Sequence, residues 1–261
     1  MTTLLLHGLG ADRRQPLELL APPIIGVAGP GEPLLAFDTR AHGESALVGE
    51  AADFALDRLA DEAVAAARAA DPAIDERPLA VMGISMGAAI ALRIALRGLL
   101  PVDRAVFVRP SFGDVPHPDN LRPFPVIGQL LHDQGPAAID GFRESWVYRQ
   151  MQHRSPAGAR ALLTQFTAPA AARRAVRLVE VPRNRAFEGD AELALLPARG
   201  IRSLVVAAER DPVHPLELGE RWAAGLEAEL VTAPPREQGM PAVTAAMRDG
   251  VARWLERTPP A

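Results

Sequence analysis

The segment VMGISMGAA at residues 81–89 joins a run of apolar residues to the start of a helical pattern. At its centre stands G-x-S-x-G, formed by Gly83, Ser85 and Gly87. A serine on a sharp turn between a strand and a helix has a strained backbone, and residues without bulk two positions before and after it avoid a collision. This pattern predicts that Ser85 is a nucleophile held above the edge of a sheet.

The same turn predicts a binding site for an oxyanion. The backbone amide of Met86 would lie in the first turn of the helix, where amides lack an intrahelical partner and the helix dipole is positive. Such an amide can stabilise the oxyanion that forms when a nucleophile attacks a carbonyl group. Ala88 and Ala89 follow it and allow the helix to pack close to the sheet.

Short apolar runs alternate with longer helical patterns on both sides of this segment. Their continuous hydrophobicity is typical of parallel strands covered by helices on both faces. We expect an α/β fold with about six parallel strands, at residues 2–6, 34–38, 79–83, 104–109, 203–208 and 228–232. Helices are expected at residues 53–70, with Asp53 as N-cap, and at 85–99, 216–226 and 241–256.

The strand pattern stops between residues 111 and 199. Four helix-like stretches replace it, at residues 125–134, 136–152, 155–166 and 169–180, and three of them open with Pro at or near the first turn. A helical insertion in a parallel sheet is most economically a cap over the carboxyl edge, where such folds bind ligands. We therefore expect a core of residues 1–110 and 200–261 and a helical cap at 111–199.

The composition excludes several kinds of chemistry. The chain has no Cys, and all 28 of its basic residues are Arg. Disulfides, thiolate nucleophiles, Schiff bases, pyridoxal phosphate anchors and P-loop lysines are therefore excluded. The remaining candidate nucleophiles are Ser, Thr, Asp and Glu, and one of the 6 His is the natural general base. No cofactor is expected, and no His pair at i, i+4 with a nearby carboxylate cluster indicates a metal site.

Charge and hydropathy argue against nucleic-acid and membrane partners. The net charge of −4 and the pI near 5.9 argue against a nucleic-acid partner, which needs a basic face. The longest uncharged apolar stretch, residues 79–92, is shorter than the ~20 residues that a bilayer requires. The amino terminus lacks the basic region of a signal peptide, so a cytoplasmic location without membrane contact is expected. The oligomeric state stays open.

Three further segments carry a family resemblance. LLLHGLG at residues 4–10, AFDTRAHGES at 36–45 and VVAAERDPVHP at 205–215 follow the order and spacing of motifs in the α/β-hydrolase fold. Together with residues 81–89 they cover the whole chain, which is similar to the serine-nucleophile branch of that superfamily. The resemblance implies that Ser85 is the nucleophile, that the Leu9 amide is a second oxyanion donor beside Met86, and that Asp211 is the triad acid.

The resemblance fails at the catalytic base. In the family a histidine lies between the last strand and the last helix, but residues 233–240 of this chain contain none. Gln238 or Glu237 occupies that position. Neutral Gln cannot take a proton from Ser85, and a Glu with an ordinary pKa of about 4.3 would be a weaker base.

Three interpretations of this gap are open. In the first, His214 serves as base from the acid loop, which must curl inward because its strand ends roughly 10 Å from the nucleophile strand. In the second, Glu237 or a histidine at position 117, 132 or 153 reaches the nucleophile. In the third, the protein has lost hydrolysis and uses the pocket for ligand binding or for isomerase, cyclase or lyase chemistry.

The favoured function is a serine hydrolase that cleaves an ester, thioester or amide of a small, largely apolar acyl compound. Trp146, Tyr148 and Phe142 in the expected cap are candidates to line an apolar pocket for that substrate. They could equally pack the cap helices against one another.

Overall fold

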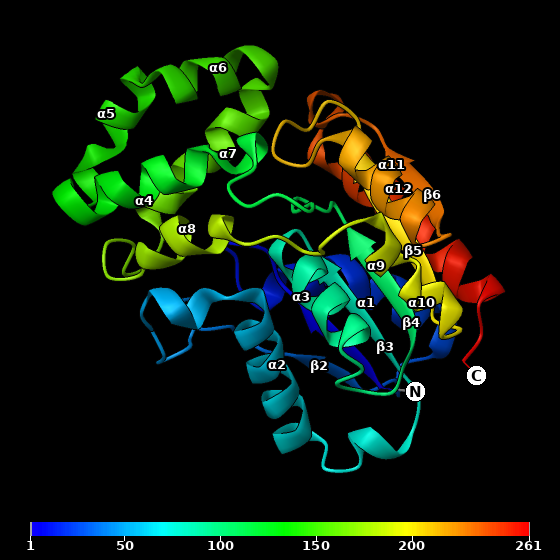
Figure 1. Ribbon diagram of the computed structural model, residues 1–261. Coiled ribbons are helices and arrows are strands. Elements are labelled where there is room, and N and C mark those ends of the chain that lie inside the picture. The colour runs from blue at the N-terminus through cyan, green and yellow to red at the C-terminus, as the bar shows by residue number, and fades with distance from the viewer. Residues whose placement is uncertain (1, 261) are drawn as a thin grey trace.

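A six-stranded parallel sheet forms the centre of the protein in the computed structural model, which describes residues 2–260 (Figure 1). The strands follow the order β2-β1-β3-β4-β5-β6, and every neighbouring pair is parallel. This confirms the expected α/β sheet. The strands are β1 (Thr3–Leu6), β2 (Leu34–Ala36), β3 (Leu79–Ile84), β4 (Val102–Val108), β5 (Arg202–Ala208) and β6 (Glu229–Ala233).

Helices cover both faces of the sheet, which explains why β3 is apolar or Gly at every position and why β4 is apolar from Ala105 onward. Alternate strand residues point to opposite faces. Leu5 and Met82 pack with α1 (Arg14–Ala28) and α12 (Met240–Arg257). The opposite face packs against three helices, α2 (Leu56–Ala70), α3 (Met86–Leu96) and α11 (Leu216–Gly225).

Helix α1 was not expected, because Pro22 and Pro23 stand inside it. A proline in a helix lacks the amide that would bond to the carbonyl four residues earlier. For Pro22 that carbonyl belongs to Glu18, and it accepts a hydrogen bond from the Arg248 guanidinium at 2.6 Å instead. Because Arg248 lies on α12, the packing of the two helices compensates for the interruption.

The start of α2 also differs from expectation. Asp53 is not its N-cap, since a separate 3₁₀ turn, η1 (Ala51–Phe54), precedes the helix. Within η1 the Asp53 carboxylate accepts a hydrogen bond from the Glu50 amide at 2.9 Å, and the two residues form a capping box. The carboxylate therefore caps the turn rather than the longer helix.

Five helices between β4 and β5 stand to one side of the sheet's carboxyl edge, and we call them the cap helices (Figure 1). They are α4 (Pro123–Gln134), α5 (Ile139–Glu144), α6 (Trp146–Arg154), α7 (Pro156–Thr167) and α8 (Val176–Glu180). Two expected helices were too long. The stretch 136–152 is interrupted at Ser145, which caps α6 by accepting a hydrogen bond from the Tyr148 amide at 3.1 Å. The stretch 169–180 is helical only from Val176, since residues 169–175 form turns in which Ala170 adopts φ +55°.

Two short helices, α9 (Asp190–Leu193) and α10 (Leu195–Ala198), fall within residues 111–199 but lie beside core elements. The first contacts α11, and the second contacts α3 and β5. The division of the chain into a core and a cap at residues 111 and 199 stays a prediction. Short 3₁₀ turns complete the structure at η2 (Ile74–Glu76), η3 (Asp119–Leu121), η4 (Pro136–Ala138), η5 (Val181–Arg183) and η6 (Arg236–Gln238).

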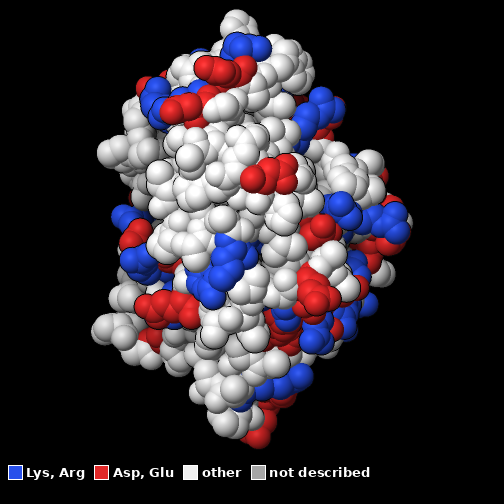
Figure 2. Space-filling model, turned by 90° about the vertical axis from the view of Figure 1, so that its left-hand side faces the viewer, with Lys and Arg blue, Asp and Glu red and all other residues white. Residues whose placement is uncertain are grey.

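The surface carries charges of both signs. Figure 2 shows arginine and acidic side chains interspersed on one face, with uncharged surface between them. Arginines of this protein are often paired with a carboxylate; Arg221 on α11, for example, donates to both oxygens of Asp114 at 2.7 Å. Among residues 2–260, every helix lacks the length or the apolar composition needed to cross a bilayer.

Candidate active site

Ser85 stands at the turn between β3 and α3 with φ +56° and ψ −111°. A residue with a side chain adopts such angles rarely, so the surrounding packing must enforce them. Two glycines make that packing possible. A Cβ at Gly83 would overlap the backbone of Gly87, and one at Gly87 would overlap the carbonyl of Leu6. The turn thus has the close backbone packing that the sequence pattern indicates.

In the structure, hydrogen bonds connect Ser85 to His214 and His214 to Asp211. Nε2 of His214 lies 3.0 Å from Oγ of Ser85, and Nδ1 lies 2.9 Å from Oδ2 of Asp211. The carboxylate can only accept, so Nδ1 donates to it and Nε2 has a free lone pair directed at the serine hydroxyl. This protonation pattern is the one in which a histidine can take a proton from a serine.

The loop after β5 places His214 by folding back on Asp211. Oδ1 of Asp211 accepts hydrogen bonds from the amides of Val213 at 3.1 Å and His214 at 3.2 Å. These bonds hold a tight turn in which the acid and the histidine, three residues apart, face each other. The turn carries the imidazole across the end of β4, which separates β5 from β3, the strand that precedes Ser85.

Burial and charge set the protonation states of this pair. Burial by itself raises the pKa of Asp211, but the adjacent His214 ring and the guanidiniums of Arg109 and Arg236 outweigh it and hold the pKa well below the usual range. Burial lowers the pKa of His214 below its ordinary 6.5, against the opposing effect of Asp211. At neutral pH, Asp211 is therefore ionised and His214 is neutral.

A second hydroxyl contacts Ser85. Oγ of Ser111, a fully buried residue in the loop after β4, lies 3.1 Å from Oγ of Ser85. Because the Ser85 proton points to His214, the Ser111 hydroxyl must be the donor in this contact. Negative charge that develops on the Ser85 oxygen would be stabilised by that bond.

The amides of Leu9 and Met86 flank the same point. Met86 is the first residue of α3, and within residues 2–260 neither amide donates a hydrogen bond to another backbone or side-chain group. The Leu9 turn is held by His7, whose Nε2 accepts from the Thr39 amide at 3.1 Å and whose Nδ1 therefore donates to the Gly8 carbonyl at 2.9 Å. Two free amides thus lie on rigid backbone near the serine.

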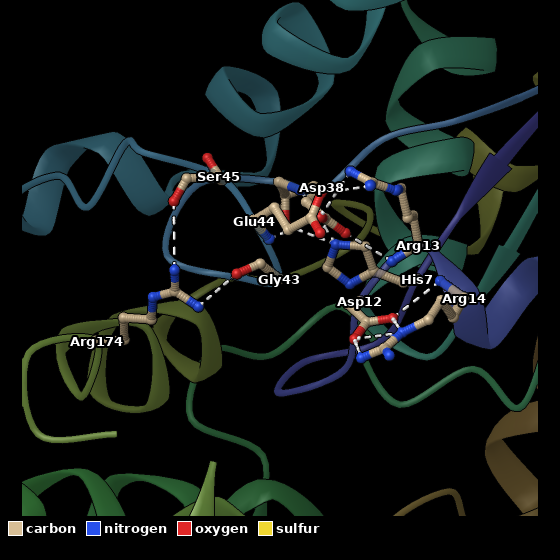
Figure 3. A network of polar contacts seen from close by, with 10 residues as sticks. His7, Asp12, Arg13, Arg14, Asp38, Gly43, Glu44, Ser45 and Arg174 are labelled. Atoms are coloured by element: carbon tan, nitrogen blue, oxygen red, sulfur yellow. Dashed lines mark hydrogen bonds and ion pairs between the residues drawn. The ribbon is translucent and has the colours of Figure 1, made fainter. Parts of the chain in front are cut away.

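A polar network fixes the loops behind this turn (Figure 3). Asp38 accepts hydrogen bonds from the amides of Arg13 at 2.7 Å and Glu44 at 2.8 Å, which joins the start of α1 to the loop after β2. Arg174, which precedes α8, donates to the Gly43 carbonyl at 2.8 Å. The cap helices are therefore tied to the same loop that supports His7.

A cavity of ≈ 320 Å³ lies between the sheet edge and the cap helices and contains Ser85. The core contributes its turns and loops, and α4 and α7 contribute the opposite wall. The apolar part of the lining includes Leu9, Val213 and Met240 from the core and Phe124 and Leu162 from the cap helices, and the charged part consists of Arg109, Asp211 and Arg236.

Several residues singled out in the sequence lie outside this cavity. Gln238 and Glu237 are exposed in η6, and Glu237 accepts a hydrogen bond from Ser155 Oγ at 2.9 Å. The side chains of three other histidines, His117, His132 and His153, are exposed as well.

The expectation that Phe142, Tyr148 and Trp146 line the substrate pocket is wrong for this cavity. Phe142 is fully buried within the cap helices, where its ring centroid lies 5.5 Å from those of Tyr148 and Phe166. Trp146 is 57% exposed. Aromatic packing between the cap helices occupies two of these side chains, and none of the three reaches the cavity.

Ser111, Arg109 and Arg236 are site residues that the sequence patterns did not indicate. Arg109 directly follows β4, and Arg236 lies in the segment where the family has its histidine. The signal for Arg109 was its place at the carboxyl end of a buried strand, where polar side chains meet the ligand edge of a parallel sheet. The signal for Arg236 was a cation in the segment between the last strand and the last helix, which approaches the same edge of the sheet.

The parallel sheet, the cap helices and the serine turn define an α/β-hydrolase fold. The chain belongs to the Alpha/beta hydrolase family, whose model matches residues 3–253. A search of curated protein sequences found no significant match.

Solved structures with the same fold share little sequence with this chain. A malate-bound thermophilic esterase from Thermogutta terrifontis is 19% identical over 98% of this chain and 90% of its own, with a TM-score of 0.65. MenH from S. aureus is 15% identical over 98% and 94%, with a TM-score of 0.67. Est816, described as an N-acyl homoserine lactone degrading enzyme, is 18% identical over 99% and 93%, with a TM-score of 0.64.

Proposed function

We propose that this protein is a serine hydrolase that cleaves an ester or thioester of a small acyl compound. The observation that carries the proposal is the 3.0 Å contact between Nε2 of His214 and Oγ of Ser85, with Asp211 on the other ring nitrogen. It supplies a general base although the usual position holds none. Ser85 is the nucleophile, and Asp211 orients the base.

In the first half of the reaction, Ser85 Oγ attacks the substrate carbonyl carbon while Nε2 of His214 takes the hydroxyl proton. The negative charge moves to the carbonyl oxygen, where the amides of Leu9 and Met86 stabilise it. When the tetrahedral intermediate collapses, the bond to the leaving group breaks and His214 returns the proton to the departing oxygen or sulfur. The acyl group remains on Ser85.

In the second half, water attacks the acyl-enzyme carbonyl and His214 takes a proton from that water. Collapse of the second intermediate breaks the bond to Ser85, whose oxygen recovers the proton. A carboxylic acid leaves, and the site returns to its starting state. Ionised Asp211 stabilises the imidazolium that forms transiently in each half.

The proposal is tested by active-site labelling. A fluorophosphonate probe is expected to form one covalent adduct, on Ser85, when the folded protein is treated at pH 7–9, because the probe reacts with serines that a base has activated. Intact-mass spectrometry and peptide mapping locate the adduct. The Ser85→Ala variant should stay unlabelled, and Ser145→Ala, which changes a serine in the cap helices, should label normally. An unlabelled wild-type protein would refute the proposal.

The acid limb of the pH profile should report His214. Burial lowers the pKa of its imidazole below the ordinary 6.5, so the ring becomes a neutral base at a lower pH than a free imidazole does. We expect the midpoint of the acid limb of kcat/KM for a small ester to lie below 6.5. His132→Gln, which removes an exposed histidine, should leave the midpoint unchanged. A midpoint above 6.5 would contradict the assignment of His214 in this environment.

A further inference from the structure

Two arginines that line the cavity, Arg109 and Arg236, share one carboxylate, and each forms only a long ion pair with it. The closest carboxylate to both is Asp211, whose Oδ2 lies 3.7 Å from a terminal nitrogen of Arg109 and 3.6 Å from Nε of Arg236. Both distances exceed the range of a hydrogen bond. The Nε atoms of both arginines are buried and have no hydrogen-bond partner among the described residues.

Asp211 cannot satisfy both guanidiniums, because its oxygens are already engaged. One oxygen accepts from two backbone amides and the other from the His214 ring. Buried Arg40 differs from this pair, because it lies between the carboxylates of Asp53 and Glu62. Among the described residues that line the cavity, two guanidiniums stand against a single carboxylate, so the cavity carries an excess positive charge.

Such a charge is costly in a partly closed site unless an anion compensates it. Burial, followed by the charge of Arg236, lowers the pKa of Arg109 only to about 10, so Arg109 remains protonated at neutral pH. Guanidinium groups bind planar carboxylates with charge-assisted hydrogen bonds. The net charge of the cavity lining is +1, so a carboxylate, with a charge of −1, neutralises it, whereas a doubly charged phosphate would leave an excess negative charge.

We propose that the substrate carries a carboxylate, which Arg109 and Arg236 bind while Ser85 attacks the acyl carbon. This inference rests on the proposed hydrolase function and names its substrate class: the monoester or monothioester of a short dicarboxylic acid. Arg109 directly follows the residue whose carbonyl accepts the Ser85 amide at 2.9 Å, so the anion site and the nucleophile lie on adjacent strand ends. Leu162 and Met240 supply apolar lining for the carbon chain between the two groups.

The test compares two esters that differ only in charge. Monomethyl succinate and methyl butyrate have the same leaving group and acyl chains of equal carbon number, and a pH-stat measures their hydrolysis. We expect kcat/KM to favour monomethyl succinate in the wild-type protein and this preference to fall about 10–100-fold in Arg236→Gln and in Arg109→Gln. Arg236→Lys should keep part of it. Arg160→Gln removes an exposed charge from α7 outside the cavity and should keep all of it.

The ratio of the two substrates separates substrate binding from a purely structural role. Loss of a charge beside Asp211 alters the base for both esters alike, whereas loss of a contact with the substrate carboxylate affects only monomethyl succinate. An equal decrease for both esters, or a wild-type protein without the preference, would overturn the inference. Should Arg109→Gln fail to fold by circular dichroism, Arg236→Gln gives the same readout.

A binding measurement keeps this inference distinct from the proposed function. Calorimetric titration of Ser85→Ala with monomethyl succinate should give saturable binding that weakens about 10–100-fold when Arg236→Gln is added. Arginine-dependent binding without turnover by the wild-type protein would refute hydrolysis and leave the anion site. Turnover of neutral esters without arginine-dependent binding would refute the anion site and leave hydrolysis.

Discussion

Replacing His214 with Gln is expected to lower kcat for ester hydrolysis about 10⁴-fold. Glutamine fills a similar volume and can form a hydrogen bond to Ser85, but it cannot take the hydroxyl proton. The remaining rate would come from the Leu9 and Met86 amides and from substrate binding alone. Steady-state kinetics with a small ester measure the loss, and circular dichroism checks that the fold is intact.

The control for this variant tests the position at which the family places its histidine. Gln238 is exposed in η6 and does not line the cavity, so Gln238→His should have the wild-type rate and should not restore activity to His214→Gln. His153→Gln, on the surface of the cap helices, should also have the wild-type rate. Full activity in His214→Gln, or its recovery by Gln238→His, would assign the base elsewhere.

The core of the fold could be predicted because its signals are local. The six strands begin and end within two residues of the expected positions, since each is an apolar run bounded by polar or turn residues. Helix α1 was missed because Pro22 and Pro23 oppose a helix locally. A contact from Arg248, more than two hundred positions away in the sequence, takes up the carbonyl that Pro22 leaves free. Such long-range compensation has no signature in the segment itself.

The candidate site shows the same limit. Ser85 and Asp211 belong to motifs that can be read from neighbouring residues, but the choice among the histidines depended on the path of one loop. That path is set by two backbone hydrogen bonds to Asp211 and by the distance across β4. The excess positive charge of Arg109 and Arg236 could not be predicted, because a sequence shows charges but not which carboxylates are already engaged.

Replacing Asp211 with Asn is expected to lower kcat about 10⁴-fold by reversing the tautomer of His214. The Asn oxygen can still accept from the amides of Val213 and His214, so the loop can keep its path. Its amino group then faces Nδ1 of His214 and donates to it, which moves the ring proton to Nε2. That nitrogen can no longer take the proton of Ser85, and raising the pH does not restore it.

The same variant also tests what Asp211 does for stability. It removes the only carboxylate that faces Arg109 and Arg236 within the described lining of the cavity, so urea denaturation should show a lower free energy of unfolding. Kinetics must therefore be measured well below the unfolding transition, with Glu209→Gln, an exposed acid in the same loop, as control. If Asp211 only held the loop, Asn would preserve the rate. A folded, inactive Asp211→Asn protein would instead show that catalysis requires the carboxylate charge and the tautomer it imposes on His214.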